Sequence, residues 1–258
     1  MAKNKIYKGI DISLFQPGAD FPAIKAAGID FVMLKAGQGR IPGEWNAPFT
    51  DPYFERYIKA ADAAGLYVGS YWYFMANTEA QVREEAAYYI ALLRKYKFNH
   101  QLWAAVDVED SHLTGDRTAL TARVKLFCDL VRAAGFRPMV YANSWWLESR
   151  FESPAGVPIW EANWSASARP SRARMWQYTS TGRVGGINGN VDMNVAFDII
   201  GDANSDGSVD MKDVIRVIRS VSGWDVKIDE SQADVNSDGY VNMKDIIQTI
   251  RTLGEDGK

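Results

Sequence analysis

The chain has 258 residues, of which 47% are hydrophobic and 24% are charged, and its formal net charge is −3. This composition is typical of a globular protein, and it excludes a strongly basic nucleic-acid binder. No apolar run approaches the roughly 20 residues that a membrane-spanning helix needs. Cys128 is the single cysteine, so it cannot form a disulfide within the chain, and we expect it to pack in the core.

Residues 1–198 show strands that alternate with helices, and then strands alone. Helical patterns are expected over 20–27, 52–64, 78–96, 116–134 and 145–150. Strand candidates are 8–13, 31–36, 66–74, 102–109, 137–143, 158–164, 174–180 and 189–197. Three helical runs end in Ala-Ala-Gly, at Gly28, Gly65 and Gly135, and glycine is the usual residue just past a helix. The pattern predicts an α/β fold, a closed parallel barrel that has lost its last helices.

Acidic residues gather where these strands end. The first strand ends on Asp11, the fourth on Asp107 and Glu109, and the eighth carries Asp192. In such barrels the chemistry lies at the carboxyl ends of the strands. Because strand side chains alternate, Asp107 and Glu109 point to one face, and two close carboxyl groups raise each other's pKa. One of them can stay protonated as the general acid that glycoside hydrolysis requires, and Glu109 is the better candidate.

Other roles are possible for such acids. A single Asp at a strand end more often caps a helix or forms an ion pair, and clustered carboxylates can hold magnesium. Four acids on three strands, without a phosphate-binding loop, favour the hydrolytic interpretation. We expect apolar neighbours such as Ile10, Ile12, Val106 and Val108 to surround the acids and raise their pKa values.

Aromatic residues narrow the substrate class. Eight of the nine Trp residues lie before residue 200, several of them beside the same strand ends. Flat apolar rings with polar rims suit sugar rings. The candidates for a sugar groove are Tyr71, Trp160, Trp164, Trp176 and Gln177. Trp103 lies early in its strand, where core packing is the expected role.

Six short motifs follow one another along these strands. They are Gly9-Ile-Asp11-Ile-Ser13 with Gln16, Lys35-Ala-Gly-Gln-Gly39, Gly69-Ser-Tyr71, Asp107-Val-Glu109, Trp176-Gln-Tyr178 and Val191-Asp192-Met-Asn194. Together they resemble the glycoside hydrolase family 25 lysozymes. The resemblance implies a modified (β/α)5β3 TIM-like barrel that cleaves the β-1,4 bond between N-acetylmuramic acid and N-acetylglucosamine, with the four acids at its site and no catalytic cofactor. Phe15 and Trp72 differ from the Trp and His that often occupy those positions in the family.

Several alternatives stay open at this point. The resemblance favours a retaining route, in which the acetamido group of the substrate, oriented by a neighbouring Asp, stabilises charge on C1. An inverting route, with Asp11 or Asp192 activating water, is the alternative, because the separation of the acids cannot be read from sequence. The barrel could also be a chitinase or plant-wall enzyme, or a glycan-binding module without catalysis.

The last fifth of the chain holds two copies of one oxygen-rich loop. Positions 1, 3, 5, 7, 9 and 12 are Asp202, Asn204, Asp206, Ser208, Asp210 and Asp213 in the first copy, and Asp234, Asn236, Asp238, Tyr240, Asn242 and Asp245 in the second. This spacing is that of a calcium loop, in which Gly at position 6 allows a sharp turn and position 7 binds through its carbonyl. Position 12 is Asp instead of the usual Glu, so either the following helix lies closer to the ion or the affinity is lower.

An apolar stripe at helical spacing follows each loop. The stripes are Val214, Ile215, Val217 and Ile218, and Ile246, Ile247, Ile250 and Leu253. Two such units are too small to hold together by core burial alone, so we expect two structural calcium ions. The duplication and the Asp at position 12 make residues 199–258 resemble a type I dockerin, a small all-α calcium-binding domain whose partner is a cohesin on a scaffold protein. An ordinary EF-hand pair, or an appendage without a partner, is the alternative.

The resemblance also implies which dockerin residues contact a cohesin. They are Met211, Lys212, Ile218 and Arg219 in the first copy, and Met243, Lys244, Ile250 and Arg251 in the second. Because the copies present the same residues, we expect binding in either of two orientations to an acidic partner surface, unless the symmetry is only a remnant of duplication. We expect domains at 1–198 and 199–258, a monomer apart from the scaffold, and a secreted or cell-surface location. The sequence starts without an apolar signal segment, and we expect that segment to have been removed.

Overall fold

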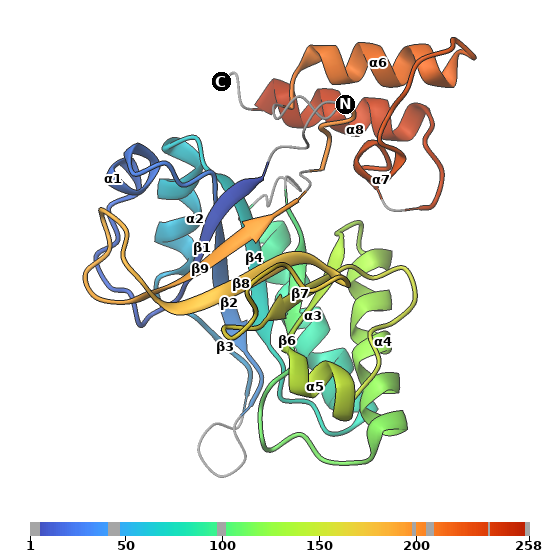
Figure 1. Cartoon of the computed structure of the whole chain (residues 1–258). Coiled ribbons are helices and arrows are strands. Elements are labelled where there is room, and N and C mark those ends of the chain that lie inside the picture. Colours follow the sequence, from blue (N-terminus) through green and yellow to red (C-terminus); the bar gives the residue numbers. More distant parts are fainter. Residues whose placement is uncertain are drawn as a thin grey trace.

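A closed α/β barrel forms the larger part of the molecule (Figure 1). The computed structural model describes residues 6–40, 47–96, 102–197, 200–204, 209–236 and 238–255. The strands are β1 (Tyr7–Ile12), β2 (Phe31–Gln38), β3 (Phe49–Thr50), β4 (Tyr67–Tyr73), β5 (Ala104–Asp107), β6 (Pro138–Asn143), β7 (Ile159–Ala162), β8 (Ala173–Gly182) and β9 (Val191–Ala196). The helices of this part are α1 (Phe21–Ala26), α2 (Phe54–Ala63), α3 (Glu79–Lys95), α4 (Arg117–Ala133) and α5 (Ser144–Ser149).

Eight strands close the barrel in the order β1-β9-β8-β7-β6-β5-β4-β2, because β1 also pairs with β2. β9 runs antiparallel to both of its neighbours, β1 and β8, and the other barrel strands pair in parallel. A helix follows each of the first five barrel strands, and β7, β8 and β9 follow without helices between them. The predicted (β/α)5β3 barrel is therefore confirmed.

Two differences from the expected strands change the description of the barrel: an additional strand and an earlier end of β5. β3 was not expected; it is a short extension that pairs only with the end of β2. β5 ends at Asp107, so Glu109 lies in the loop beyond the strand. The reason is that ladder pairing with β4 and β6 stops at Asp107, although the N–H of Val108 still donates to the carbonyl of Tyr141 at 2.9 Å.

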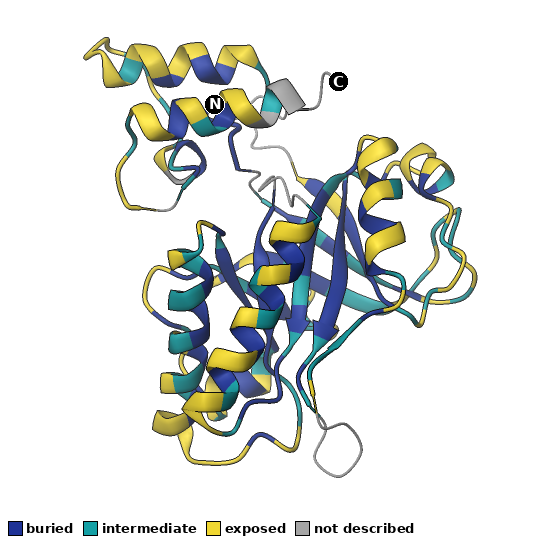
Figure 2. Ribbon diagram, turned by 180° about the vertical axis from the view of Figure 1, so that it is seen from behind, coloured by how far each residue is buried: buried dark blue, intermediate teal, exposed yellow. Residues whose placement is uncertain are grey.

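Strand alternation divides the apolar residues into two clusters. One cluster lies between the strands and the surrounding helices, and it includes the buried Cys128, as predicted. Ile10, Ile12, Val106 and Val108 belong to this outer cluster, and of the four only Ile12 also lines the pocket that holds the acids. Figure 2 shows the buried residues concentrated on the strands and on the helix faces turned toward them.

Residues 200–255 form a small helical unit with α6 (Met211–Val221), α7 (Glu230–Ala233) and α8 (Met243–Glu255). Val214, Val217 and Ile246 are buried in a core of their own, with Leu253 packed against it. The rest of each predicted stripe, Ile215, Ile218, Ile247 and Ile250, is exposed, because two helices cannot cover stripes of this width. Within the described ranges, no helix is both long and apolar enough to cross a membrane.

The helical unit lies against the amino-terminal end of the barrel, beside β1 and β9 (Figure 1). Ile200 and Val235 are buried in one cluster with Leu102 and Trp103, which precede β5. The core position expected for Trp103 is thus confirmed, although part of its surroundings comes from the helical unit. The carboxyl ends of the parallel strands lie at the opposite end of the barrel.

Candidate active site

All four predicted acids line one pocket of about 190 Å³ at the carboxyl ends of the barrel strands. Asp11 and Asp192 lie directly opposite each other in the antiparallel ladder between β1 and β9. Asp107 ends β5, and Glu109 reaches the pocket from the loop that follows. The pairing of Asp11 with Asp192 thus depends on β9 running antiparallel to β1 in this register.

A hydrogen-bond network holds Asp11. Its Oδ2 accepts from Nε2 of Gln177 at 2.9 Å and from Nδ2 of Asn194 at 2.8 Å. Burial, and then the charge of Asp192, raises the pKa of Asp11 to about 8. Burial raises the pKa of Asp192 as well, so the two opposed carboxyl groups keep one proton between them to a higher pH than an exposed aspartate would.

We expect Asp11→Asn to stabilise the protein while lowering its activity. The amide oxygen can accept both hydrogen bonds now made to Oδ2, and the amide NH2 can donate to Asp192. In the wild type the folded pKa of Asp11 exceeds its unfolded value, so stability falls as pH rises from about 4 toward 8. The gain in melting temperature should thus grow across this window, which thermal unfolding at pH 5, 6, 7 and 8 measures. An equal gain at every pH would contradict the shared proton.

The other two acids face a buried lysine. Burial, and then the charge of Glu109, raises the pKa of Asp107 well above its usual range. Burial, and then the charge of Asp192, raises the pKa of Glu109. Lys35 opposes both shifts; its Nζ donates to Oε1 of Gln38 at 3.0 Å and lies 4.7 Å from the centre of the Tyr73 ring. The site thus holds two carboxyl groups whose pKa values are raised by burial and by neighbouring acids, and Lys35 limits both rises.

Lys35→Met should move the pH–rate profile toward higher pH. Without the ammonium group the pKa of Glu109 rises further, so Glu109 stays protonated to a higher pH and the basic limb shifts upward. Lys35→Arg keeps the positive charge and is the matched control, with a profile close to that of the wild type. The pH–rate profiles of both variants between pH 4 and 9, on the peptidoglycan that the sequence resemblance implies as substrate, measure the effect. Superimposable profiles for Lys35→Met and the wild type would exclude this role.

The predicted sugar-groove residues separate into two groups. Tyr71, Trp160 and Gln177 line the pocket. Trp164 lies at its edge, where the indole Nε1 donates to Oε1 of Gln177 at 3.0 Å. Trp176 is not among the lining residues; it alternates with the inward-facing Gln177, and its indole donates to the carbonyl of Asn163. The structure therefore does not bring Trp176 to the acids.

Several pocket residues were not predicted. Ser13, Gln16, Lys35, Tyr73 and Tyr141 all line it, and all but Tyr73 and Tyr141 lie in the motifs that carried the family resemblance. Asn194 does not line the pocket but contacts two residues that do. Its Oδ1 accepts from the indole of Trp160 at 2.8 Å, and its amide donates to Asp11. The rings of Tyr141 and Trp160 are 4.6 Å apart. These rings and Ile12 are apolar groups that line the pocket beside the acids.

Two departures from the family pattern have different consequences. Phe15 lines the pocket and is 74% exposed, so it presents an apolar ring at the entrance. Trp72 points away from the pocket into the helical layer, where its indole donates to Oε2 of the buried Glu85 at 2.9 Å. Only Phe15 is therefore placed to alter a sugar subsite. Glu161, at the end of β7, is paired with Arg172 at 2.8 Å and does not line the pocket.

The residues of the two tail loops have the chemistry of a calcium site. Asp213 and Asp245 at position 12 are fully buried, and each accepts from two backbone N–H groups of its loop. Asp234 and Asp238 raise the pKa of Asp245, after burial, so carboxylates converge there. In the described part of the chain no three acidic, His or Cys side chains form a ligand group by themselves, and the remaining donors are amide and carbonyl oxygens. Asp206 and Ser208 lie outside the described residues.

The predicted cohesin contacts lie on the surface of the helical unit that the barrel does not cover. Met211 and Met243 are 53% and 56% exposed, so the barrel covers neither copy. The side chains of Lys212 and Lys244 are 72% and 76% exposed. Ile218, Arg219, Ile250 and Arg251 are also exposed. The two copies therefore present similar surfaces.

Comparisons with known proteins agree with this geometry. The sequence matches Glycosyl hydrolases family 25 over residues 10–187 and the Dockerin type I domain over residues 200–254. The autolytic lysozyme of Clostridium acetobutylicum is 28% identical over 189 residues, which cover 72% of this chain and 54% of that protein, so the chain spans about half of that relative. An N,O-diacetylmuramidase of Chalaropsis sp. is 30% identical over 184 residues, covering 66% of this chain and 84% of that protein.

A solved structure shows the same fold. A family 25 glycosyl hydrolase from Bacillus anthracis superposes with a TM-score of 0.63 at 21% identity, over 77% of this chain and 91% of that one. The family 25 match covers well over half of the sequence and includes three of the four acids; Asp192 lies just beyond it. The chain therefore belongs to glycosyl hydrolases family 25, a family of glycoside hydrolases, and carries a type I dockerin domain in residues 200–254.

Proposed function

We propose that the chain is an N-acetylmuramidase, which cleaves the β-1,4 bond between N-acetylmuramic acid and N-acetylglucosamine in peptidoglycan. The observation that carries this proposal is the gathering of Asp11, Asp107, Glu109 and Asp192 in one pocket lined by aromatic rings. The autolytic lysozyme and the N,O-diacetylmuramidase among its relatives support the same substrate.

In this proposal Glu109 is the general acid. Its raised pKa keeps a proton available for the leaving glycosidic oxygen, and Lys35 limits the rise so that the proton can still be given up. As the glycosidic bond breaks, the acetamido oxygen of the substrate attacks C1, and a neighbouring Asp orients the acetamido group. Water then opens the resulting ring, so the configuration at C1 is retained. In the alternative, inverting route, Asp192 or Asp11 removes a proton from the water that attacks C1 directly. Asp192, which lines the pocket with Glu109, suits either role.

Mass spectrometry of the fragments released from purified peptidoglycan tests the function. A muramidase leaves reducing ends on N-acetylmuramic acid and releases none from chitin or xylan. Reducing N-acetylglucosamine ends, or release from chitin or xylan, would support a different glycosidase. Tight binding to peptidoglycan without any release would support a module that only binds glycan.

We propose further that the dockerin binds two calcium ions and attaches the enzyme, as a monomer, to a cohesin on an extracellular or cell-surface scaffold protein. The oxygen-rich loops and the exposed, repeated surface of α6 and α8 support this assignment. Asp213 and Asp245, at the start of the helices that follow the loops, would contribute carboxylate ligands, and bound calcium would supply structural cross-linking.

Removal of calcium should spare the chemistry. The four acids and the dockerin lie at opposite ends of the barrel, and an acid that must donate a proton cannot be bound to a cation. We expect EDTA to reduce the helical signal of the dockerin and to leave hydrolysis of cell walls at 25 °C within about twofold of the untreated rate. A chain truncated after Phe197 is the control, and EDTA should not change its rate. Loss of activity in that truncated chain on EDTA treatment would show that the barrel needs a metal.

A further inference from the structure

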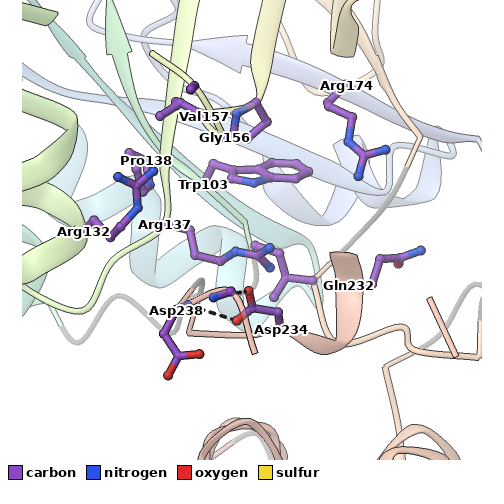
Figure 3. A pocket seen from close by; sticks show the side chains of 14 residues that line it. Trp103, Arg132, Arg137, Pro138, Gly156, Val157, Arg174, Gln232, Asp234 and Asp238 are labelled. Carbon is purple, nitrogen blue, oxygen red and sulfur yellow. Dashed lines mark hydrogen bonds between the residues drawn. The ribbon is translucent and has the colours of Figure 1, made fainter. Parts of the chain in front are cut away.

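The two calcium loops have nearly the same sequence but different surroundings. Asp202 and Asp234 occupy position 1 of their loops. Asp202 is only 2% exposed. Asp234 is partly exposed and lines a cavity of about 590 Å³ between the second loop and the barrel, together with Trp103, Arg137 and Arg174 (Figure 3). Position 1 is therefore more deeply buried in the first loop than in the second.

Two tyrosines at the amino-terminal end of the barrel hold the first loop. Tyr7, the first residue of β1 and itself buried, donates its phenol hydrogen to Oδ2 of Asp202 at 3.0 Å. Tyr67, the first residue of β4, packs edge-to-face on Tyr7 with the ring centres 6.1 Å apart. Val209, at position 8 of the first loop, packs with Tyr67 against the buried cluster that contains Tyr7. Positions 1 and 8 of the first loop are thus both tied to the barrel.

Apolar burial keeps the dockerin in this place. Ile200, just before the first loop, and Val235, in the second loop, are each 4% exposed within the cluster that contains Tyr7 and Trp103. A contact of this kind excludes water from the Tyr7–Asp202 hydrogen bond and so strengthens it.

We propose that Tyr7 is a positioning residue for calcium in the first loop, so that docking of the dockerin on the barrel and calcium binding in this loop strengthen each other. The proposal goes beyond the attachment role of the dockerin and rests on it only for calcium binding itself. It gives position 1 of the first loop a hydrogen bond from the barrel, whereas the second loop meets the barrel through the apolar packing of Val235.

The reasons lie in the chemistry of a buried carboxylate. One oxygen of Asp202 accepts the phenol hydrogen, and lone pairs remain on the carboxylate for a cation. A hydrogen bond behind a metal ligand fixes its orientation, and loss of such a bond typically weakens metal binding 10–100-fold. Because coupling between two binding equilibria is reciprocal, calcium must favour docking by the same factor by which docking favours calcium.

Calcium titration of the chelator-treated full-length chain, followed by calorimetry, tests the proposal. Tyr7→Phe removes one hydroxyl group and keeps the packed ring. We expect it to weaken one site by about tenfold or more and to leave the other unchanged. Tyr88→Phe is the matched control, because it removes a hydroxyl that is hydrogen-bonded to Thr50, away from both loops, and we expect both affinities to be unchanged. Superimposable titrations for Tyr7→Phe and the wild type would overturn the proposal.

The wild-type chain provides a second test that needs no substitution. Calcium should slow hydrogen exchange at the start of β1 and β4, in peptides that contain Tyr7 and Tyr67, as well as in the dockerin. Exchange in these barrel peptides that is the same with and without calcium would also overturn the coupling. A chain that binds no calcium at all would instead contradict the calcium assignment made above.

Discussion

Replacing Glu109 by Gln is expected to lower the rate of cell-wall hydrolysis by about 10²–10⁴-fold, the usual contribution of a general acid. Gln has nearly the same shape, but its amide cannot transfer a proton to the leaving oxygen. Glu109 lies in the pocket with Asp107 and Asp192, and its pKa is raised, so it meets the requirements of position and protonation together. Release of reducing ends from purified cell walls measures the effect.

Two controls separate this effect from loss of structure. Glu152→Gln makes the same chemical change at an exposed residue that pairs with Arg117 at 3.4 Å, and we expect the wild-type rate. The melting temperature of Glu109→Gln should equal or exceed that of the wild type, because a buried acid with a raised pKa is replaced by a neutral amide. If Glu109→Gln retained most of its activity, another residue would have to be the acid. An inverted anomer in proton NMR of the wild-type products would exclude only the acetamido-assisted route.

Changing both copies of the exposed dockerin surface should abolish cohesin binding, whereas changing either copy alone should have little effect. Met211 with Lys212, and Met243 with Lys244, offer the same apolar and basic pair with nearly equal exposure. If the two orientations are equivalent, loss of one halves the association constant, which corresponds to about 0.4 kcal/mol. Acidic residues at all four positions remove both surfaces and add repulsion toward an acidic partner.

Calorimetry with a cohesin that binds the wild-type chain distinguishes these outcomes. We expect each double substitution to weaken binding by about twofold and the fourfold substitution to reduce it beyond detection, about 10³-fold or more. Lys227→Glu, an exposed charge reversal on the same domain but outside α6 and α8, should leave binding unchanged. Complete loss from one double substitution alone would show that only one copy contacts the cohesin.

Most of the fold was predicted from local sequence patterns. The helix limits follow from apolar spacing and from glycines: Gly28 and Gly65 adopt φ values of 84° and 69°, which glycine allows at a helix end. The order of strands and helices was enough to predict the barrel. The predicted end of β5 was wrong because the apolar run continues past the last ladder pair, and sequence does not show where pairing stops.

The active-site residues also divide into those that the sequence placed correctly and those whose contacts depend on the tertiary structure. Asp107 and Glu109 were placed together correctly because they are two residues apart, and a strand repeats every two residues. The pairing of Asp11 with Asp192, and the support from Gln177 and Asn194, depend on β9 running antiparallel between β1 and β8. Trp176 was expected in the groove because it is an aromatic residue near a strand end, yet alternation along β8 turns it outward when Gln177 points in.

The sequence by itself determined which groups are present: four acids at strand ends, two calcium loops and a repeated pair of exposed residues. These are features of neighbours along the chain, and residue spacing controls them directly. Only the tertiary structure decided which acids share a proton, and which calcium loop accepts a hydrogen bond from a barrel tyrosine. Asp11 meets Asn194 across 183 residues, and Tyr7 meets Asp202 across 195. Such contacts form only when the barrel closes and buries both partners, because closure fixes the strand register and excludes water from the pairs.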